Sequence, residues 1–289
     1  MTAPPIRWPA PAKLNLFLHI TGRRADGYHL LQSVFQLLDH GDLLDFSLRD
    51  DGLIHRSNDI AGLPEDDDLV IRAARALQAA VRARTGRATP GADITLEKTL
   101  PMGGGLGGGS SDAATTLIAL NHLWQAGLTR AELMALALPL GADIPFFLFG
   151  RNAFAEGVGE SMAAVETPDC WYVVIEPGVM VPTAVIFNVS QLTRDSKPVK
   201  ITDFSAALDN FGKNDLQEVA AGLFPPIAEA LGWLGKFGNA RMTGSGACVF
   251  CAFAQEAQAQ AALELVPARW KAWKAKALAR HPLEHLLSE

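Results

Sequence analysis

The chain has 289 residues, of which 49% are hydrophobic and 19% charged, so it is an ordinary globular protein with material for roughly two domains. Its net charge of −6 argues against a broad surface for nucleic acid or an anionic membrane, although a local basic cleft for a phosphorylated ligand stays possible. Residues 1–8 lack the apolar core of a signal peptide, and the most apolar region, residues 133–149, is interrupted by two prolines and Asp143. We therefore expect a soluble, cytoplasmic protein without a membrane or nucleic-acid partner.

Residues 12–20 alternate in the manner of a strand, with Lys13 and Asn15 on one face and leucines on the other. Two polar side chains on an otherwise apolar strand fit a solvated edge and the lining of a cleft equally well. A turn-rich, basic loop follows at residues 21–29. It contains Tyr28, one of only two tyrosines, and His29. The loop could be an ordinary hairpin connection, or it could hold a nucleobase by stacking and edge hydrogen bonds.

Regular elements are predicted on both sides of a glycine-rich segment. Residues 29–38 fit a strand or a helix, 42–48 a strand, 69–84 an amphipathic helix and 92–98 a strand. After the glycines, apolar residues at helical spacing predict a helix to Gln125, and a second helix is expected at 130–138.

The glycine-rich segment, residues 101–112, reads PMGGGLGGGSSD between the predicted strand and helix. Glycines let backbone N–H groups approach a phosphate, and a helix N-terminus favours negative charge, so we predict an anion site. A dinucleotide fingerprint would need a second strand ending in an acidic residue about 20 residues on, and a helix follows instead. A Walker A loop would need Lys where Ser110 stands. A flexible linker fits poorly between two regular elements, which leaves a nucleotide-triphosphate loop of a third type.

A carboxylate stands in an apolar setting at Asp143, ahead of Ile-Pro-Phe-Phe. An aspartate in this position could simply cap the following helix. It could also be a functional carboxylate, since an isolated buried charge needs a partner.

The C-terminal half is predicted to contain an apolar strand at 171–176, a helical stretch at 216–234 broken at Pro225-Pro226, and a helix at 255–265. A second glycine turn, residues 241–247, leads into an apolar strand that carries Cys248 and Cys251. Three cysteines do not make a disulfide framework, and we interpret this pair as buried structural thiols rather than a zinc or redox site.

Three separated blocks together resemble the motifs of the GHMP kinases (galacto-, homoserine, mevalonate and phosphomevalonate kinases). They are residues 11–16 (PAKLNL), 101–111 and 242–247 (MTGSGA). Within that family, residues 21–29 (TGRRADGYH), 141–147 (GADIPFF) and 182–187 (PTAVIF) resemble the kinases of a cytidyl diphosphate substrate in the non-mevalonate isoprenoid pathway. Two departures are small: Thr243 stands where Ser is frequent, and Asp112 where Asn is frequent.

The resemblance implies an α+β, two-domain fold with the active site in the cleft between the domains. We expect an N-terminal ATP-binding domain at residues 1–158 and a C-terminal ferredoxin-like α/β-plait domain at 159–289. The implied reaction is phosphoryl transfer from ATP, with Mg²⁺, to the 2-hydroxyl of a methylerythritol moiety on the cytidyl diphosphate substrate. The expected assembly is a monomer or weak homodimer.

The resemblance also assigns residues to roles. Lys13 and Asp143 become the catalytic pair, and the substrate would lie near Asn15, Tyr28, His29, Thr183 and Phe187. ATP would bind Lys98, Pro101, Met102, Gly103, Gly104, Gly105, Leu106, Gly107, Gly108, Gly109, Ser110 and Ser111. Ser111 is a weaker candidate for a magnesium-linked hydroxyl, the metal ligands being otherwise unassigned, and the acidic run at 66–68 is assigned no contact.

Two other functions fit parts of the pattern. Another GHMP small-molecule kinase, for a sugar or homoserine, would keep the glycine loop but lack the nucleobase residues Tyr28, His29 and Phe187. A catalytically silent nucleotide-binding regulator would keep the loop and lose the base, so the presence of both Lys13 and Asp143 disfavours it.

Overall fold

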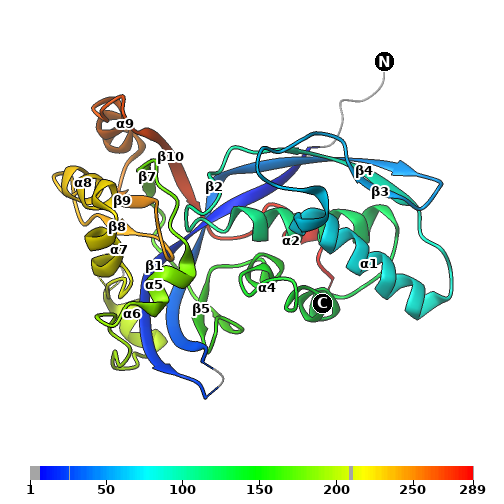
Figure 1. Ribbon diagram of the computed structural model, residues 1–289, viewed down its shortest axis with the longest axis horizontal. Helices are drawn as coiled ribbons and strands as arrows, with labels where there is room; N and C mark the ends of the chain where they lie inside the picture. Colours follow the sequence, from blue (N-terminus) through cyan, green and yellow to red (C-terminus); the bar gives the residue numbers. More distant parts are fainter. Residues whose placement is uncertain (1–6, 26, 208–210, 289) are drawn as a thin grey trace.

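A computed structural model describes residues 7–25, 27–207 and 211–288 (Figure 1). Two long strands, β1 (Trp8–Arg23) and β2 (His29–Arg49), form an antiparallel hairpin that runs through both halves of the molecule. Their pairing register shifts between Pro11 and Lys13, between Asn15 and Leu18, and between Ile20 and Gly22. Such irregularities bend a strand and re-aim its side chains, which lets one hairpin curve from one half to the other.

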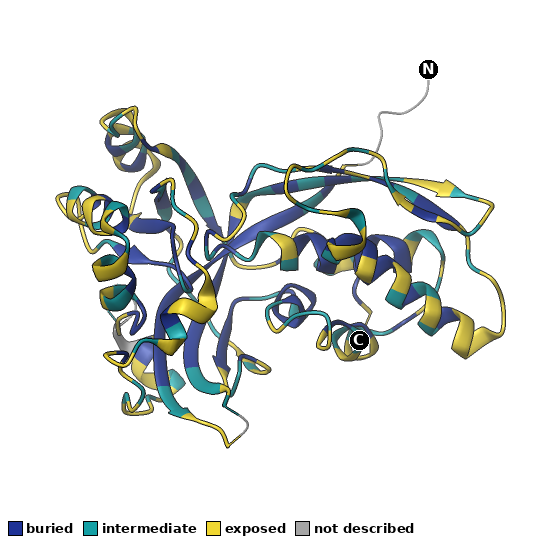
Figure 2. Cartoon of the chain, in the orientation of Figure 1, coloured by how far each residue is buried: buried dark blue, intermediate teal, exposed yellow. Residues whose placement is uncertain are grey.

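The N-terminal half adds strands β3 (Ile54–Arg56) and β4 (Gly91–Glu97), and β5 (Ala153–Glu156) with β6 (Ser161–Ala164). β4 and β5 pair with different stretches of β2, both on the edge away from β1. The helices are the short 3₁₀ helix η1 (Glu65–Asp67), α1 (Leu69–Thr85), α2 (Gly108–Leu123), α3 (Arg130–Ala137) and α4 (Ile144–Phe149). The side chain of Asp68 caps α1 by accepting the Val70 N–H at 2.9 Å, and Gly86 ends the helix at φ +68°. Helix α2 is buried along most of its length, whereas α1 presents its outer face to solvent (Figure 2).

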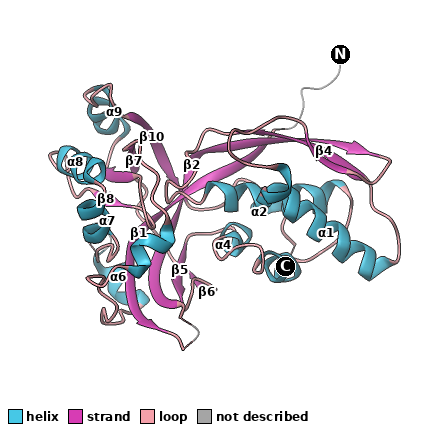
Figure 3. Cartoon of the chain, in the orientation of Figure 1, coloured by secondary structure: helices cyan, strands magenta, loops and turns pink. Residues whose placement is uncertain are grey.

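The C-terminal half is a four-stranded antiparallel sheet in the order β10-β7-β9-β8, from β7 (Trp171–Glu176), β8 (Arg241–Met242), β9 (Val249–Phe253) and β10 (Lys271–Leu278). This order, with helices between β7 and β8 and between β9 and β10, is that of a ferredoxin-like plait. The helices are α5 (Thr183–Asn188), α6 (Ile201–Ala207), α7 (Gln217–Leu223), α8 (Pro225–Leu234) and α9 (Glu256–Glu264) (Figure 3). The predicted break at Pro225-Pro226 separates α7 from α8, because a proline fits the first turn of a helix but not its interior.

The last strand joins the two halves. β10 pairs with β7 over most of its length, and its end pairs with β2 through Ala277–Leu38 and Leu278–Leu37. The chain then returns to the N-terminal half in the 3₁₀ helix η3 (Glu284–Leu286). The α+β fold is therefore confirmed with one sheet common to both halves, while the boundary between residues 158 and 159 stays a prediction.

Most predicted elements are confirmed, and two ambiguities are resolved. Residues 29–38 are strand rather than helix, and they continue without interruption into the strand predicted at 42–48. Cys248 and Cys251 are buried free thiols in and beside β9, and burial raises the pKa of Cys251 to about 11, in keeping with structural roles.

Among the described residues, no helix has the length and apolar character needed to cross a membrane.

Candidate active site

The glycine segment forms a loop whose backbone only glycine adopts readily. Gly103, Gly105 and Gly107 have φ of +69°, +76° and +72°. Gly107 is the N-cap of α2, and no side chain there accepts a hydrogen bond from the first turn of the helix. The exposed N–H groups at the start of this 16-residue helix are therefore available to an anion.

The glycines also allow the other two motifs to touch the loop. A Cβ at Gly105 would lie 2.2 Å from the Thr243 carbonyl oxygen, and one at Gly107 would lie 3.1 Å from Cγ of Lys13. Backbone hydrogen bonds join the same segments: the Lys13 N–H donates to the Leu106 carbonyl at 2.9 Å, and the Cys248 N–H donates to the Gly104 carbonyl at 3.1 Å. Motifs far apart in the sequence thus meet around residues 103–107.

A cavity of about 400 Å³ lies on one side of the loop. It is lined by every residue from Pro101 to Ser110, and by Leu63, Asp67, Asp68, Leu69, Leu96, Lys98 and Asp112. Ser111, just behind this surface, is fully buried. A pocket with an anion-binding loop on one wall and apolar side chains on the other has the character required by a nucleotide's phosphates and base.

Lys98 is held at the base of this cavity by two buried carboxylates. Its Nζ lies 2.5 Å from Oδ2 of Asp42 and 2.8 Å from Oδ2 of Asp112. Burial alone would lower the pKa of Lys98, but the two carboxylates outweigh it and raise that pKa. Burial, reinforced by Asp42, raises the pKa of Asp112 well above its ordinary value against the opposing charge of Lys98. The Lys98 ammonium is therefore held as a cation in the lining of the cavity.

A second cavity, about 280 Å³, borders the same loop. Its wall includes Gly103, Gly105 and Gly107, which line both cavities, so the two spaces adjoin at the loop. The remaining lining residues are Lys13, Asn15, Leu18, Leu31, Phe35, Asp143, Thr183, Phe187, Leu216, Gly244, Ser245 and Gly246. A phosphate in the first cavity and an acceptor molecule in the second would therefore be neighbours.

Lys13 and Asp143 meet at this second cavity. The Lys13 Nζ lies 3.5 Å from Oδ2 of Asp143, donates to Oδ1 of Asn15 at 2.6 Å, and sits 5.2 Å from the centre of the Phe35 ring. The Lys13 side chain is 4% exposed and that of Asp143 is 39% exposed. Although Asp143 stands at the N-cap of α4, its side chain makes no capping hydrogen bond. The carboxylate therefore faces the cavity rather than serving the helix.

Hydroxyl and amide groups complete the polar wall. The Asn15 N–H donates to Oγ1 of Thr243 at 3.0 Å, and the Asn15 side chain donates to Oγ of Ser33 at 2.8 Å. The hydroxyls of Thr183 and Ser245 lie 2.9 Å apart. Lys13 and Asn15 thus belong to a cleft, which decides between the two interpretations of their strand.

The three residues expected to bind the nucleobase do not all lie at the second cavity. Phe187 lines the second cavity, and the ring of His29 packs against it with centroids 4.8 Å apart and an interplanar angle of 34°. Tyr28 is 66% exposed near the tip of the β1–β2 hairpin and does not line that cavity. Asp26, in the same motif, lies outside the described residues.

Several residues of the site were not expected from the sequence. Asp42 and Arg194 act from β2 and from the segment after α5, and neither stands in a recognisable motif. Asn214 donates through its side chain to the carbonyls of Met242 and Gly244, both at 2.8 Å, which supports the second glycine turn. Asp67 and Asp68, to which no contact was assigned, line the nucleotide-side cavity; Asp68 is also paired with Arg56 at 2.7 Å.

The first turn of α2 offers oxygen atoms suited to Mg²⁺. Oγ of Ser111 and Oδ1 of Asp112 are buried without a hydrogen-bond partner. Mg²⁺ in kinases takes one or two protein oxygens together with substrate phosphates, so these atoms fit such an ion. No cluster of three or more His, Cys, Asp or Glu side chains that could hold a metal by itself occurs in the described ranges.

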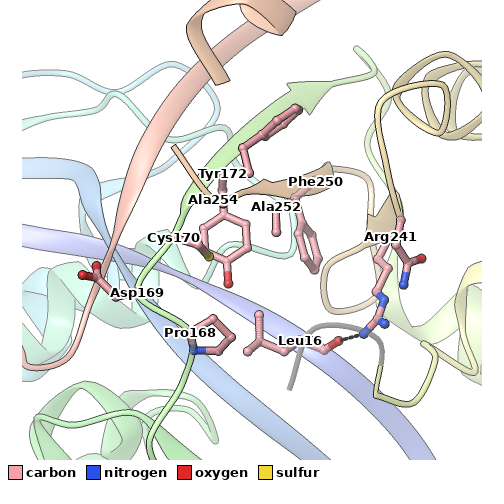
Figure 4. A pocket seen from close by; sticks show the side chains of 11 residues that line it. Leu16, Pro168, Asp169, Cys170, Tyr172, Arg241, Phe250, Ala252 and Ala254 are labelled. Carbon is pink, nitrogen blue, oxygen red and sulfur yellow. Dashed lines mark hydrogen bonds between the residues drawn. The ribbon is translucent and has the colours of Figure 1, made fainter. Parts of the chain in front are cut away.

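Another cavity, of about 370 Å³, lies apart from the glycine loop against β7 and β9 (Figure 4). Its lining includes Leu16, Tyr172, Arg241 and Phe250, with Asp169 at one side. Arg241 Nη1 donates to the backbone carbonyls of Leu16 and Phe211, so its guanidinium supports the strand next to Asn15. None of the predicted site residues lines this cavity.

Comparison with known proteins agrees with this geometry. Residues 68–151 match the model of the GHMP kinases N terminal domain, and residues 200–272 match that of the GHMP kinases C terminal domain. The chain belongs to the GHMP kinases and is an ATP-dependent small-molecule kinase. A mevalonate kinase from Methanococcus jannaschii, 15% identical with a TM-score of 0.69 over 96% of this chain and 100% of its own, shares the fold.

Relatives with higher sequence identity show to which group of GHMP kinases the chain belongs. A 4-diphosphocytidyl-2-C-methyl-D-erythritol kinase from Herminiimonas arsenicoxydans is 72% identical, with 96% of each chain covered, and one from Azoarcus sp. strain BH72 is 64% identical with the same coverage. A crystal structure of a 4-(cytidine 5'-diphospho)-2C-methyl-D-erythritol kinase is 34% identical with a TM-score of 0.80, covering 94% of this chain and 99% of its own. Within the GHMP kinases, the chain belongs to the family of 4-diphosphocytidyl-2-C-methyl-D-erythritol kinases.

Proposed function

We propose that this enzyme transfers the γ-phosphoryl group of ATP to the 2-hydroxyl of 4-diphosphocytidyl-2-C-methyl-D-erythritol, giving the 2-phosphate and ADP. The observation that carries the proposal is the pair of cavities that share residues of the glycine loop, one reaching Lys98 and the α2 N-terminus and the other reaching Lys13 and Asp143. In this arrangement ATP lies on the Lys98 side and the cytidyl substrate on the Asp143 side. Such an enzyme works in the cytoplasm as a monomer or weak homodimer.

The proposed chemistry assigns one role to each polar group. Phosphoryl transfer asks mainly for positioning and for stabilisation of spread negative charge, which the loop amides and Lys98 supply. Asp143 accepts the proton of the attacking hydroxyl, and Lys13 attracts and orients that carboxylate across 3.5 Å. Asn15 holds Lys13, while Thr183 and Ser245 bind polar groups of the substrate.

We propose that Mg²⁺ binds together with the phosphates of ATP. Ser111 and Asp112 would hold it, and when bound it would neutralise charge on the transferring phosphate. The protein's own residues still decide which hydroxyl is deprotonated, because Asp143 lines the cavity in which the acceptor would bind.

The direct test is product formation with the purified enzyme, ATP and the cytidyl substrate. Phosphorus NMR should show one new phosphomonoester on the methylerythritol moiety and an equal amount of ADP. A phosphate on the ribose, or ADP formed without any phosphorylated product, would contradict the proposal.

A further inference from the structure

The guanidinium of Arg194 contacts both His29 and Phe187, the two expected nucleobase residues whose rings pack together. Arg194, in the segment after α5, donates from Nε to Nε2 of His29 at 3.2 Å. From Nη2 it donates to the carbonyl of Phe187 at 2.9 Å. It also donates to the carbonyls of Val189 and Leu192, at 2.7 and 3.1 Å. Arg194 thus contacts the ring of one pocket residue and the backbone of the other.

These contacts hold Phe187 at the end of a short helix. Helix α5 is only six residues long, so it has little stability of its own. The carbonyls of Phe187 and Val189 are among those that a helix end leaves without an internal partner, and the forked guanidinium can satisfy several of them at once. A lysine, with one compact ammonium, cannot span the same set of acceptors.

The bond to His29 selects one form of its ring. Because Arg194 Nε–H is a donor, Nε2 of His29 must offer its lone pair, and the neutral imidazole then carries its proton on Nδ1. The charged groups that act on His29 are both cations: Arg194, and Arg23 at the end of β1. Burial first, and then these two cations, lower the pKa of His29.

We propose that Arg194 is a positioning residue for nucleobase recognition, which holds His29 neutral in its Nδ1–H form against Phe187. The inference rests on the proposed function, since it assumes that Phe187 and His29 meet the cytosine base. It adds a residue that touches neither the reacting hydroxyl nor the ATP phosphates. A neutral ring in this form offers Nδ1–H as a donor to an acceptor on an uncharged base edge, whereas the other tautomer would offer a lone pair there and an imidazolium would add a charge that the base does not match.

The test uses three variants of the full-length enzyme: Arg194→Met, Arg194→Lys and, as a matched control, Arg82→Met on the exposed outer face of α1. Arg194→Met should raise KM for the cytidyl substrate by about tenfold, the scale of losing a hydrogen bond to a charged group, while kcat and KM for ATP stay within about twofold. Arg194→Lys should lie close to Arg194→Met rather than to wild type. Arg82→Met should match wild type.

The protonation state of His29 provides a second measurement, which should not change if Arg194 only stabilises the fold. Nitrogen-15 shifts of His29, assigned by comparison with His29→Gln, should show a protonated Nδ1 and an unprotonated Nε2 in wild type. KM for the cytidyl substrate should be flat between about pH 6 and 8 in wild type, and should become pH-dependent near the ordinary histidine pKa of about 6.5 in Arg194→Met.

The outcomes separate the two proposals. Equal substrate KM values for Arg194→Met and Arg82→Met, or a protonated Nε2 in wild-type His29, would overturn the role of Arg194. If Arg194→Met fails to fold, the His29 proton position in wild type and the kinetics of Arg194→Lys still decide. If the wild-type enzyme does not phosphorylate the cytidyl substrate, the proposed function fails. A proton on Nδ1 of His29 would then confirm the hydrogen bond from Arg194, but the role of Arg194 in nucleobase recognition would fail with the function.

Discussion

Asp143 is the proposed catalytic base, because its carboxylate faces the second cavity and makes no capping hydrogen bond to α4. Replacing it by Asn keeps the shape and removes both the base and its attraction to Lys13. Asp143→Asn should therefore lower kcat by several powers of ten, and ATP affinity should be nearly unchanged. Single-turnover kinetics and ATP titration measure the two quantities. Near-native turnover would mean that the carboxylate is not the base.

Tyr28 tests the nucleobase pocket from its exposed side. The residue is 66% exposed, and a tyrosine ring has an apolar face on which a base can stack. Tyr28→Ala should weaken binding of the cytidyl substrate by about 1–3 kcal/mol, the usual scale of base stacking. Calorimetric titration of the substrate into each protein gives the comparison. Unchanged affinity would remove Tyr28 from the pocket and leave Phe187 and His29.

At the scale of elements, the glycine loop depends on close backbone contact with the second glycine turn. A Cβ at Gly105 would lie 2.2 Å from the Thr243 carbonyl oxygen, and its φ is +76°. Gly105→Ala should therefore cost stability of about 1–3 kcal/mol and weaken ATP binding, because loop or turn must move. Urea unfolding and ATP titration test this.

Gly109 provides the matched control for that substitution. It lies in the first turn of α2, and an added Cβ would meet only Leu69 Cδ1, at an ordinary 3.7 Å. Gly109→Ala should leave stability unchanged or raise it by about 0.5–1 kcal/mol, the gain of alanine over glycine in a helix. Equal losses in the two variants would show that general crowding, not the Gly105–Thr243 contact, limits the loop.

Sequence patterns predicted the elements that are marked by residues close together in the chain. They did not predict contacts between residues far apart in the sequence. The strand, glycine loop and helix around residues 91–123 follow from alternation, glycine content and helical spacing, and they are found where expected. Asp42 holds Lys98 from 56 positions away, and Arg194 holds His29 from 165 away. No local pattern records such pairs, because they meet only in the folded chain, where β4 pairs with β2 and the segment after α5 packs against His29. The alternation of β1 was also an incomplete guide, since its register shifts re-aim side chains along the strand.

At the scale of the whole molecule, the segment after β10 fastens the C-terminus to the N-terminal half. The His281 N–H donates to the Gly150 carbonyl at 2.8 Å, and its Nδ1 accepts the Leu283 N–H at 3.1 Å. Arg151 pairs with Glu284 at 2.7 Å in the same region. His281 is 2% exposed, and burial lowers its pKa to about 4 against the opposing charge of Glu284.

That lowered pKa predicts acid sensitivity with a defined sign. A folded-state pKa below the ordinary value of about 6.5 means that the neutral ring stabilises the fold above that pH. This contribution, on the order of 3 kcal/mol, is lost as pH falls from about 6.5 through about 4. His281→Gln should remove most of this acid-side loss, whereas the exposed His55→Gln should not. Urea unfolding at about pH 7 and pH 4.5 makes the comparison, and equal acid losses in wild type and His281→Gln would contradict it.

With ATP in one cavity and the acceptor in the other, the enzyme should phosphorylate a single acceptor substrate. The most direct measurement is ADP release with ATP and Mg²⁺ against the cytidyl-diphospho-methylerythritol substrate, mevalonate, homoserine and galactose, each offered alone. We expect release with the cytidyl compound only. Release with another compound would contradict the nucleobase roles of Tyr28, His29 and Phe187. Silence with all four despite measurable ATP binding would contradict the catalytic roles of Lys13 and Asp143.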